Sequence, residues 1–393
     1  MKLLTFATLY PSAARPGHGI FVETRLRHLL ASGAAQSVVV APVPWFPAGQ
    51  EGFGRYGTMA RTPRRETLHG IDVYHPRFPL VPKVGMSTAP FLLAAASARA
   101  LREVRDGGHD FDVIDAHYFY PAGVAAALLG RRFGRPVVIT ARGSDINLIA
   151  RHTIPRRLIV WAARQAACVV TVSQALKSAT EELGVDSSKM RVLRNGVDAQ
   201  AFRPFDRDSE RSRLGVTGWL LLTVGNLVEL KGNDLVIRSL GFLPNTQLCL
   251  VGDGPDRGRL EKVARQVGVE DRVHFVGQLP QSDLPRYYSA ADALVLASSR
   301  EGWPNVLLEA MACGTRVVAS RVGGVAEMVT SAAAGLLFES RTVDSLVAAI
   351  RRLLDGTVTR DATRRHAERF SWDETTKGQL VLFERVVTKS RVS

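Results

Sequence analysis

The sequence predicts an α/β protein with two parallel β-sheets, each covered by helices on both faces. Short apolar runs rich in β-branched residues alternate with amphipathic helical patterns, as expected for buried parallel strands. The length of 393 residues allows two or three domains, each large enough to bury its own core. A stretch of charged and turn-forming residues at 195–218 separates two series of apolar runs. We therefore expect two domains.

The apolar runs give the predicted strands in chain order. The first series comprises KLLTFATLY, SVVVAPV, DVIDA, PVVITA and CVVTV, and the second comprises WLLLTV, QLCLV, ALVLA and RVVAS. We place the amino-terminal domain at residues 1–200 and the carboxyl-terminal domain at residues 201–371. The segment from Trp45 to Arg65 has Pro and Gly at both ends, which predicts a long loop.

Residues 372–393 have the pattern of a helix. Leu380, Phe383 and Val387 recur at spacings of three and four, so they share one face. This helix could pack back on the first domain.

The charge balance points to anionic partners. Lys and Arg number 51 against 37 Asp and Glu, a formal net charge of +14. Nucleic acid, an acidic membrane surface and a phosphorylated small molecule would each fit this excess. The sequence has no compact Lys/Arg tract of the kind found in nucleic-acid-binding arms.

The cysteines predict a cytoplasmic protein. Cys168, Cys249 and Cys313 are far apart and lie among apolar neighbours, as reduced core cysteines do. The apolar run in MKLLTFATLY is short, so we expect no signal peptide. No stretch reaches the roughly 20 apolar residues that a membrane span needs.

The strongest candidate site follows the predicted strand Ala293–Ala297, because ligands of open α/β sheets bind beyond the carboxyl ends of strands. Pro304 is the expected first residue of a helix that Gly314 ends. The start of a helix presents unpaired N–H groups that suit a phosphate. Glu301 and Glu309 flank this start, and carboxylates accept hydrogen bonds from sugar hydroxyls. Acids near helix starts are also common without any function.

Two further loops of the second half are weaker candidates. Lys231 follows the predicted strand Trp219–Val224, where an ammonium group suits a pyrophosphate, although surface lysines need no function. Gly252 and Gly254 permit a tight turn and a close backbone approach. Their spacing fails the dinucleotide pattern G-x-G-x-x-G, so a nicotinamide cofactor is not supported.

Polar groups also follow predicted strands of the first half. Gly17 and Gly19 would let a phosphate or sugar approach the start of the next helix, where His18 and Glu23 are the polar residues. His117 stands at a strand exit, although a lone histidine is as often structural. Another polar strand exit contains Arg142, Ser144 and Asp145.

Together these motifs resemble the retaining glycosyltransferases of family 4, which have the GT-B fold. In the second half the resemblance rests on VGNLVELKG, VGDGP, SSREGWPNVLLEAMACGTRVVAS and VGGVAEMV. In the first half it rests on RPGHGIFVETRLRHL, DAHYFYPAG, TARGSD and VLRNGVD. It covers nearly the whole chain, and the order and spacing of the strings are more specific than any one of them.

The resemblance implies two Rossmann-like domains whose parallel sheets face a central cleft. It implies an enzyme that transfers a hexose or related sugar from a UDP- or GDP-linked donor, with retention of configuration and without a metal or other cofactor. The acceptor would be a carbohydrate or a lipid-linked molecule, in cell-surface polysaccharide or glycolipid synthesis.

The resemblance also assigns residues. His117 would lie beside the donor sugar, Lys231 would neutralise the diphosphate and Glu301 would hold hydroxyls of the donor sugar, as the catalytic set. Donor-binding residues would be Gly19, Asn226, Gly252, Asp253, Trp303, Pro304, Asn305, Val306, Leu307 and Glu309. The acceptor side would include Glu23, Arg142 and Asp145.

The chain departs from the family at Asn226, where an arginine is frequent. Another arginine or helix dipoles could supply part of that charge. A GT-B epimerase or phosphorylase and a basic nucleic-acid-binding protein are the alternatives. We interpret the positive charge as help in approaching anionic lipid headgroups at the inner membrane face, where many relatives glycosylate their acceptors.

Overall fold

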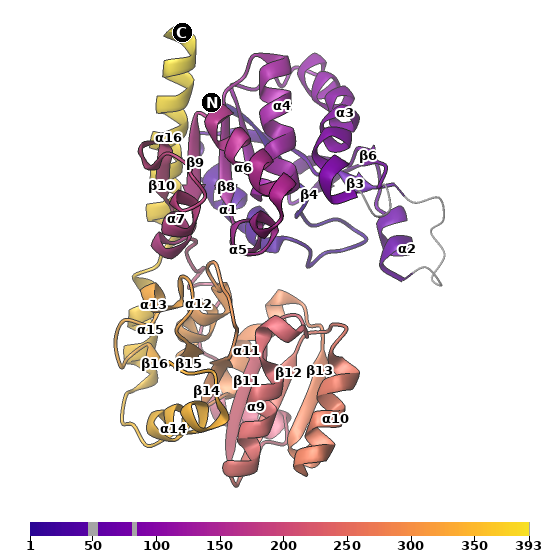
Figure 1. Ribbon diagram of the computed structural model, residues 1–393. Helices are drawn as coiled ribbons and strands as arrows, with labels where there is room; N and C mark the ends of the chain where they lie inside the picture. Colours follow the sequence, from indigo (N-terminus) through magenta and orange to yellow (C-terminus); the bar gives the residue numbers. More distant parts are fainter. Residues whose placement is uncertain (46–53, 81–84, 393) are drawn as a thin grey trace. The chain divides into compact units, whose positions relative to one another are not determined.

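The chain folds into two compact units. The computed structural model describes residues 1–45, 54–80 and 85–392 (Figure 1). Unit 1 comprises Met1–Arg194 and Asp373–Ser393, and unit 2 comprises Asn195–Trp372. No helix within the described ranges is long and apolar enough to cross a membrane.

The main sheet of unit 1 has eight strands in the order β10-β9-β8-β7-β1-β2-β5-β4. Its neighbours are parallel except for β4 and β5, which are antiparallel. A separate parallel pair is formed by β3 (Val43–Pro44) and β6 (Arg77–Phe78). The order reverses between β1 and β7, which makes their carboxyl ends the switch point of the sheet. The main strands are β1 (Lys2–Ala7), β2 (Gln36–Val40), β4 (Arg65–Leu68), β5 (Ile71–Tyr74), β7 (Val113–His117), β8 (Val137–Ala141), β9 (Cys168–Thr171) and β10 (Met190–Val192).

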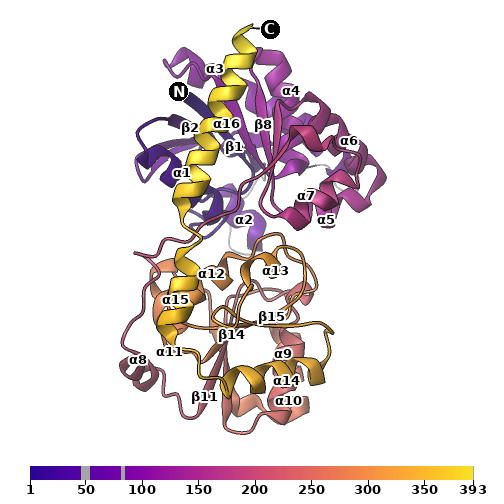
Figure 2. The same ribbon diagram turned by 90° about the vertical axis from the view of Figure 1, so that its left-hand side faces the viewer.

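Helices cover both faces of this sheet because its central strands are apolar on both sides. On one face α3, α4 and α6 pack against one another (Figure 1). On the other face lie α1 and α16 (Figure 2). The helices of unit 1 are α1 (Ile20–Ala31), α2 (Gly54–Ala60), α3 (Gly85–Asp106), α4 (Val124–Phe133), α5 (Ser144–Asn147), α6 (Thr153–Gln165), α7 (Gln174–Glu181) and α16 (Trp372–Val392).

Helix α16 completes the core of unit 1 from the far end of the chain. Phe383 and Val387 pack with Val113 of β7 and Val138 of β8. Phe383 is only 1% exposed. Each such side chain contributes about 1.5–3 kcal/mol by leaving water, so the last helix is part of the unit that the first strand begins.

The sheet of unit 2 has six parallel strands in the order β13-β12-β11-β14-β15-β16. This is the order of the Rossmann fold, and it reverses between β11 and β14. The strands are β11 (Trp219–Val224), β12 (Thr246–Val251), β13 (Val273–Gly277), β14 (Ala293–Leu296), β15 (Val317–Ser320) and β16 (Gly335–Phe338).

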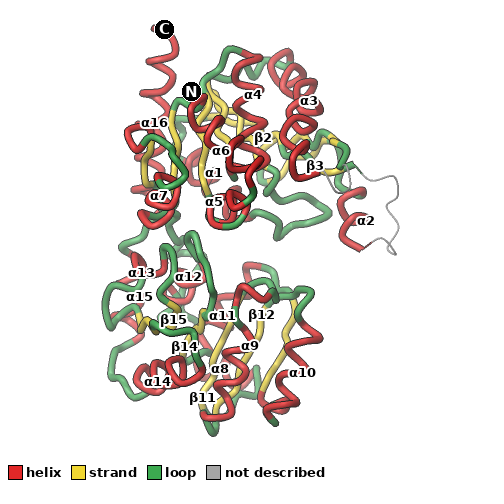
Figure 3. Tube along the Cα trace, in the orientation of Figure 1, coloured by secondary structure: helices red, strands yellow, loops and turns green. Residues whose placement is uncertain are grey.

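Helices flank the sheet of unit 2 as well (Figure 3). The core on one face joins Leu221 of β11 to Ile237 of α9, Leu260 of α10 and Leu346 of α14. On the other face α11, α12 and α15 pack against one another. The helices are α8 (Arg207–Arg213), α9 (Asn233–Ser239), α10 (Arg257–Val267), α11 (Leu284–Ala290), α12 (Asn305–Ala312), α13 (Val325–Met328), α14 (Val343–Leu354) and α15 (Arg360–Glu368).

The structure corrects several details of the sequence-based elements. The predicted loop from Trp45 to Arg65 contains helix α2 and ends where β4 begins, while residues 46–53 lie outside the described residues. Strand β4 has no fully buried residue and pairs with one neighbour only, so it lacks the continuous apolar run that marks the buried strands. Helix α12 begins at Asn305, because Pro304 has an extended backbone with ψ 95°.

The packing of α16 predicts a large effect of truncating its central aromatic residue. We expect Phe383→Ala to lower the free energy of unfolding by about 3–5 kcal/mol, because it leaves a cavity in the core of unit 1. Val381, on the same helix, is 66% exposed, and Val381→Ala is expected to change stability by less than about 0.5 kcal/mol. Urea titration followed by circular dichroism measures both. Equal losses in the two variants would contradict the packing of α16.

Candidate functional site

In each unit, polar side chains gather where the central strands end. In unit 2, Lys231 follows β11 and Glu301 follows β14, the two strands at which the order reverses. In unit 1, Gly19 follows β1 and His117 ends β7, which are again the two strands of the switch point. Open α/β sheets bind ligands at these positions. Among residues 1–45, 54–80 and 85–392, no group of three or more His, Cys, Asp or Glu is arranged to hold a metal ion.

Lys231 and Glu301 are in direct contact in unit 2. Nζ of Lys231 donates to Oε1 of Glu301 at 2.7 Å, and the hydroxyl of Ser298 donates to the same oxygen at 2.7 Å. Oε2 of Glu301 has no hydrogen-bond partner within the described part of the chain. The lysine side chain is 23% exposed and the glutamate 11%. The pair therefore keeps one carboxylate oxygen and ammonium protons available to a ligand.

Ser298 was not among the residues predicted from sequence. It is the first residue after the last apolar residue of the predicted strand, in the polar stretch SSREG. Its hydroxyl holds Glu301 in one orientation. The position of Ser298 at a strand exit did not by itself predict this contact.

The loops after β11 and β12 touch each other at their glycines. Gly252 has a φ of +134°, and a Cβ atom on it would lie 2.0 Å from the carbonyl oxygen of Gly225. The N–H of Leu227 donates to the carbonyl of Asp253 at 2.9 Å. Glycine is therefore required at 252, and the contact brings the exposed residues Asn226 and Asp253 to the same edge of the sheet.

The start of α12 offers backbone groups more than side chains. The indole N–H of Trp303 donates to the carbonyl of Asn195 at 3.0 Å, and the amide of Asn195 donates to Oδ1 of Asn305 at 3.2 Å. The side chain of Leu307 is completely buried in the core. The groups that suit a ligand here are the N–H groups of Asn305 and Val306 at the helix start.

Glu309 accepts a hydrogen bond from a buried tyrosine. The hydroxyl of Tyr288, on α11, donates to Oε2 of Glu309 at 2.8 Å. Burial raises the pKa of Glu309 to about 7, although the bond from Tyr288 opposes this shift. Hydroxyl donors of a ligand would favour the ionised carboxylate. Tyr288 is a residue that sequence reasoning missed, because it lies on a helix rather than at a strand exit.

In unit 1 the start of α1 approaches the end of β1. Gly19 has a φ of +73°, and a Cβ atom there would lie 2.3 Å from the carbonyl carbon of Leu9, so only glycine fits. Burial lowers the pKa of His18 to about 4, which makes its imidazole neutral at pH 7. Glu23 is 3% exposed and its Oε1 lies 2.5 Å from Nδ1 of His69.

His117 is buried, with both ring nitrogens engaged. Nη2 of Arg142 donates to Nδ1 at 2.8 Å, so the ring proton lies on Nε2, which donates to Oδ2 of Asp115 at 3.1 Å. Burial lowers the pKa of His117, and Arg142 adds to this shift while Asp115 opposes it. The ring is therefore neutral and 1% exposed. Its expected contact with a donor sugar stays a prediction.

Two arginines, Arg25 and Arg142, balance the negative charge of Asp115 beside His117. Arg25 donates to the carbonyl of Leu193 at 3.0 Å, and burial lowers the pKa of Arg25 to about 10 and that of Arg142 to about 9. Burial alone would raise the pKa of Asp115, but His117 and the two guanidinium groups lower it overall. Asp115 and His117 lie two residues apart on one face of β7, a strand alternation that could have pointed to this pair.

Asp145 organises backbone at the exit of β8. Its carboxylate accepts N–H bonds from Phe119 at 2.7 Å, Gly143 at 2.8 Å, Arg142 at 3.1 Å and Ile146 at 3.2 Å. Asp145 is completely buried. Any effect of Asp145 on an acceptor would therefore pass through the loop that it shapes, and its acceptor-side role stays a prediction.

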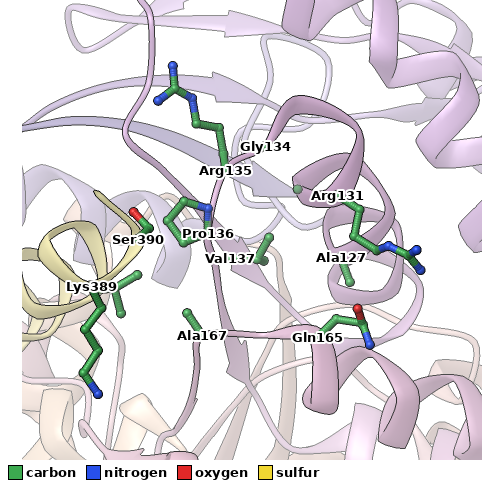
Figure 4. Close-up of a pocket in the computed structure, with 12 residues that line it drawn as sticks. Ala127, Arg131, Gly134, Arg135, Pro136, Val137, Gln165, Ala167, Lys389 and Ser390 are labelled. Carbon is green, nitrogen blue, oxygen red and sulfur yellow. The ribbon is translucent and has the colours of Figure 1, made fainter. Parts of the chain in front are cut away.

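A pocket of about 410 Å³ lies at the opposite edge of the unit 1 sheet (Figure 4). It is lined by Pro136 and Val137 at the start of β8 and by Lys389 and Ser390 near the end of α16. Arg135 at its border donates to both carboxylate oxygens of Asp110, at 2.7 and 2.8 Å. The pocket lies at the amino ends of the strands, so it is separate from the strand exits where ligands of such sheets bind.

The raised pKa of Glu309 predicts a pH-dependent effect of removing its charge. Folding raises the pKa from 4.5 to about 7, so the native state holds a proton that the unfolded chain releases, and stability is lost as pH rises between these values. We expect Glu309→Gln to raise the melting temperature at pH 8 and to have a smaller effect at pH 5. Differential scanning fluorimetry without ligand measures this. Glu270, which is exposed, gives the control variant Glu270→Gln; a pH-independent difference for Glu309→Gln would contradict the prediction.

Family comparisons cover both units. Residues 16–201 match the model described as Glycosyltransferase Family 4, and residues 204–370 match the model described as Glycosyl transferases group 1. Among solved structures, sucrose-phosphate synthase from Thermosynechococcus elongatus aligns with a TM-score of 0.82 at 21% identity, over 99% of both chains. Anabaena HepE, solved in complex with UDP and glucose, aligns with a TM-score of 0.76 at 22% identity, over 98% of this chain and 100% of HepE. These structures show the fold.

Sequence relatives extend over most of the chain. The D-inositol 3-phosphate glycosyltransferase of Acidothermus cellulolyticus is 33% identical over 335 residues, which are 77% of this chain and 74% of that enzyme. TuaC of Bacillus subtilis, named as a teichuronic acid biosynthesis glycosyltransferase, is 31% identical over 361 residues, which are 90% of this chain and 89% of TuaC. With such relatives, and with family models matched in both of its Rossmann-like units, the chain belongs to the group 1 glycosyltransferases of the GT-B fold.

Proposed function

We propose that the protein transfers a hexose or related sugar from a UDP- or GDP-linked donor to a carbohydrate or lipid-linked acceptor, with retention of anomeric configuration. The family gives sugar transfer from a nucleotide sugar. The observation that supports the proposed binding of the donor is the 2.7 Å contact between Lys231 and Glu301 at the switch point of unit 2. It combines a cation for a diphosphate with an acceptor for sugar hydroxyls.

The charges of the reaction match this arrangement. Breaking the glycosyl–phosphate bond leaves negative charge on the nucleotide diphosphate and positive character on the sugar. Lys231 and the N–H groups at the start of α12 would stabilise the departing diphosphate. These groups face charge that develops during the reaction, so they would lower the barrier more than they strengthen binding.

Glu301 would position the donor rather than attack it. Its Oε1 already accepts hydrogen bonds from Lys231 and Ser298. Oε2 would then accept a hydrogen bond from a donor hydroxyl. For retention, the acceptor oxygen bonds to the anomeric carbon on the face that the diphosphate leaves, and the acceptor proton passes to the departing phosphate oxygen. This sequence needs no carboxylate nucleophile of the hydrolase kind.

The nucleotide would lie on the loops that follow β11 and β12, with its ribose hydroxyls on Glu309. The close approach of Gly225 and Gly252 exposes backbone there. In unit 1 we propose that Gly19 approaches a phosphate and that His117 lies beside the donor sugar, with Glu23, Arg142 and Asp145 on the acceptor side. We further propose that no metal is needed, because Lys231 and the start of α12 supply positive charge.

The acceptor is proposed from relatives and from charge. TuaC is named for teichuronic acid biosynthesis, and the solved structure of WaaG is described as a glycosyltransferase involved in lipopolysaccharide biosynthesis. Both names support a cell-surface polysaccharide or glycolipid as the product. A net charge of +14 supports a cytoplasmic enzyme that approaches the anionic inner face of the membrane.

Substitution of the two contact residues tests the catalytic assignment. We expect Lys231→Ala and Glu301→Ala each to lower kcat by at least about 100-fold, the scale of losing one preorganised electrostatic contact. Steady-state release of nucleoside diphosphate measures the rate. Lys262, exposed on α10, provides the control Lys262→Ala, which should retain wild-type kcat. Rates near wild type in both active-site variants would refute the assignment.

A donor screen tests the substrate class. Uridine and guanosine diphosphate sugars are compared by thermal shift, because a ligand that binds only the folded protein raises the melting temperature according to its affinity. We expect one nucleotide series to stabilise the protein and its sugar to be transferred. NMR of the product should show the same anomeric configuration as the donor. An inverted product would exclude retention, and conversion of the donor without transfer would favour an epimerase.

A further inference from the structure

One face of helix α6 in unit 1 is basic and partly apolar. Its residues recur at spacings of three and four, and they line a surface hollow of about 410 Å³. We call the following set the α6 face: Thr153, Arg156, Arg157, Val160, Trp161 and Arg164. The opposite face of α6 is buried in unit 1 through Pro155, Ile159, Ala162 and Ala163, so the α6 face is directed outward.

No ion pair within the described part of the chain neutralises the positive charge of the α6 face. Arg156, Arg157 and Arg164 are exposed, and none of them forms an ion pair with the described residues. The helix itself, residues 153–165, contains no Asp or Glu. Two other arginines of unit 1 do have carboxylate partners, since Arg135 bonds to Asp110 and Arg391 bonds to Asp112.

Apolar side chains lie beside these cations. Ile154, in the first turn of α6, is 51% exposed, and Leu148, just before the helix, is 42% exposed. Trp161 and Val160 are half-buried between the arginines. Exposed aliphatic residues at the rim of a cationic face cost free energy in water, and they give a surface that favours both anionic and apolar contacts.

We infer that the α6 face, with Ile154 and Leu148, docks the protein on an anionic phospholipid surface. Arginines attract acidic headgroups, tryptophan favours the headgroup region and the aliphatic side chains reach the acyl boundary. Nucleic acid would use the cations but would leave Ile154 and Leu148 in water. The inference deepens the membrane approach proposed above and rests on it, but it does not depend on which sugar is transferred.

Sedimentation of the full-length protein with vesicles tests the role of charge. The variant Arg156→Glu/Arg157→Glu is compared with Arg238→Glu/Arg265→Glu, which changes the net charge equally at exposed positions of α9 and α10. Binding to vesicles that contain phosphatidylglycerol should fall at least about tenfold in the α6 variant and less than about threefold in the control. Equal losses, or no loss in the α6 variant, would overturn the inference, because binding would then follow net charge alone.

An uncharged variant tests the apolar contact. Ile154→Ser leaves the charge unchanged at an exposed position, and it should weaken binding about fivefold. Quenching of tryptophan fluorescence by bromine-labelled acyl chains should be strong for the wild type and weak for Trp161→Phe. Unchanged quenching in Trp161→Phe would place the contact elsewhere. RNA binding that falls in the α6 charge variant, with vesicle binding retained, would assign the face to nucleic acid and overturn the inference.

Activity in solution separates this inference from the proposed function. With a water-soluble acceptor, the Arg156→Glu/Arg157→Glu variant should transfer sugar at the wild-type rate. Lost vesicle binding with retained transfer supports the inference. If the wild type transfers no sugar but binds vesicles through the α6 face, the proposed function fails and the inference stands.

Discussion

A sheet with helices on both faces can present functional side chains only at the ends of its strands, and this constraint determines where polar residues lie in both units. The central strands of each sheet are largely apolar because helices cover both faces, so polar side chains gather at the carboxyl ends of these strands and in the loops that follow. At the switch point, neighbouring loops turn to opposite faces of the sheet and leave room between them. In unit 2 this point lies between β11 and β14, and Lys231 meets Glu301 across it. The reversed strand order is therefore what brings residues 70 positions apart into contact.

The polar clusters of the two units differ in burial and in the hydrogen-bonding groups that they leave free for a ligand. In unit 1, hydrogen bonds link three buried residues at the carboxyl ends of β7 and β8, namely Asp115, His117 and Arg142. Both ring nitrogens of His117 are used in these bonds. Such a cluster fixes geometry, because removing one member would leave a buried charge unpaired. In unit 2, Lys231 and Glu301 are partly exposed, and each keeps hydrogen-bonding capacity for a ligand. The first cluster is closed to further hydrogen-bond partners at His117, whereas the second keeps groups available to a ligand.

The sequence predicted the elements that show a clear apolar pattern and the polar residues that directly follow a strand. The α/β class and the strand Trp219–Val224 follow from continuous apolar runs, and the structure has that strand at the same residues. Strand β4 escaped prediction because it alternates exposed and half-buried residues at the edge of a sheet. Lys231 and Glu301 were found because they follow strands. Tyr288 lies on a helix outside every motif, and Arg25 lies inside a motif that does not reveal its partner. Only the packing of their helices brings them to Glu309 and Asp115.

The asparagine at 226 changes how positive charge is distributed at the edge of unit 2. A lysine paired with a carboxylate is partly neutralised, so Lys231 alone offers less than a full charge to a diphosphate. Arg341 lies at the same edge, where its Nε donates to the carbonyl of Ala297 at 3.0 Å. The helix start at Asn305 adds a partial positive charge that no carboxylate within its first turn offsets. A donor hydroxyl on Oε2 of Glu301 would also draw electron density from that carboxylate, which loosens its hold on Lys231. In the proposed arrangement, binding of the sugar would thus strengthen the positive charge that Lys231 presents to the leaving group.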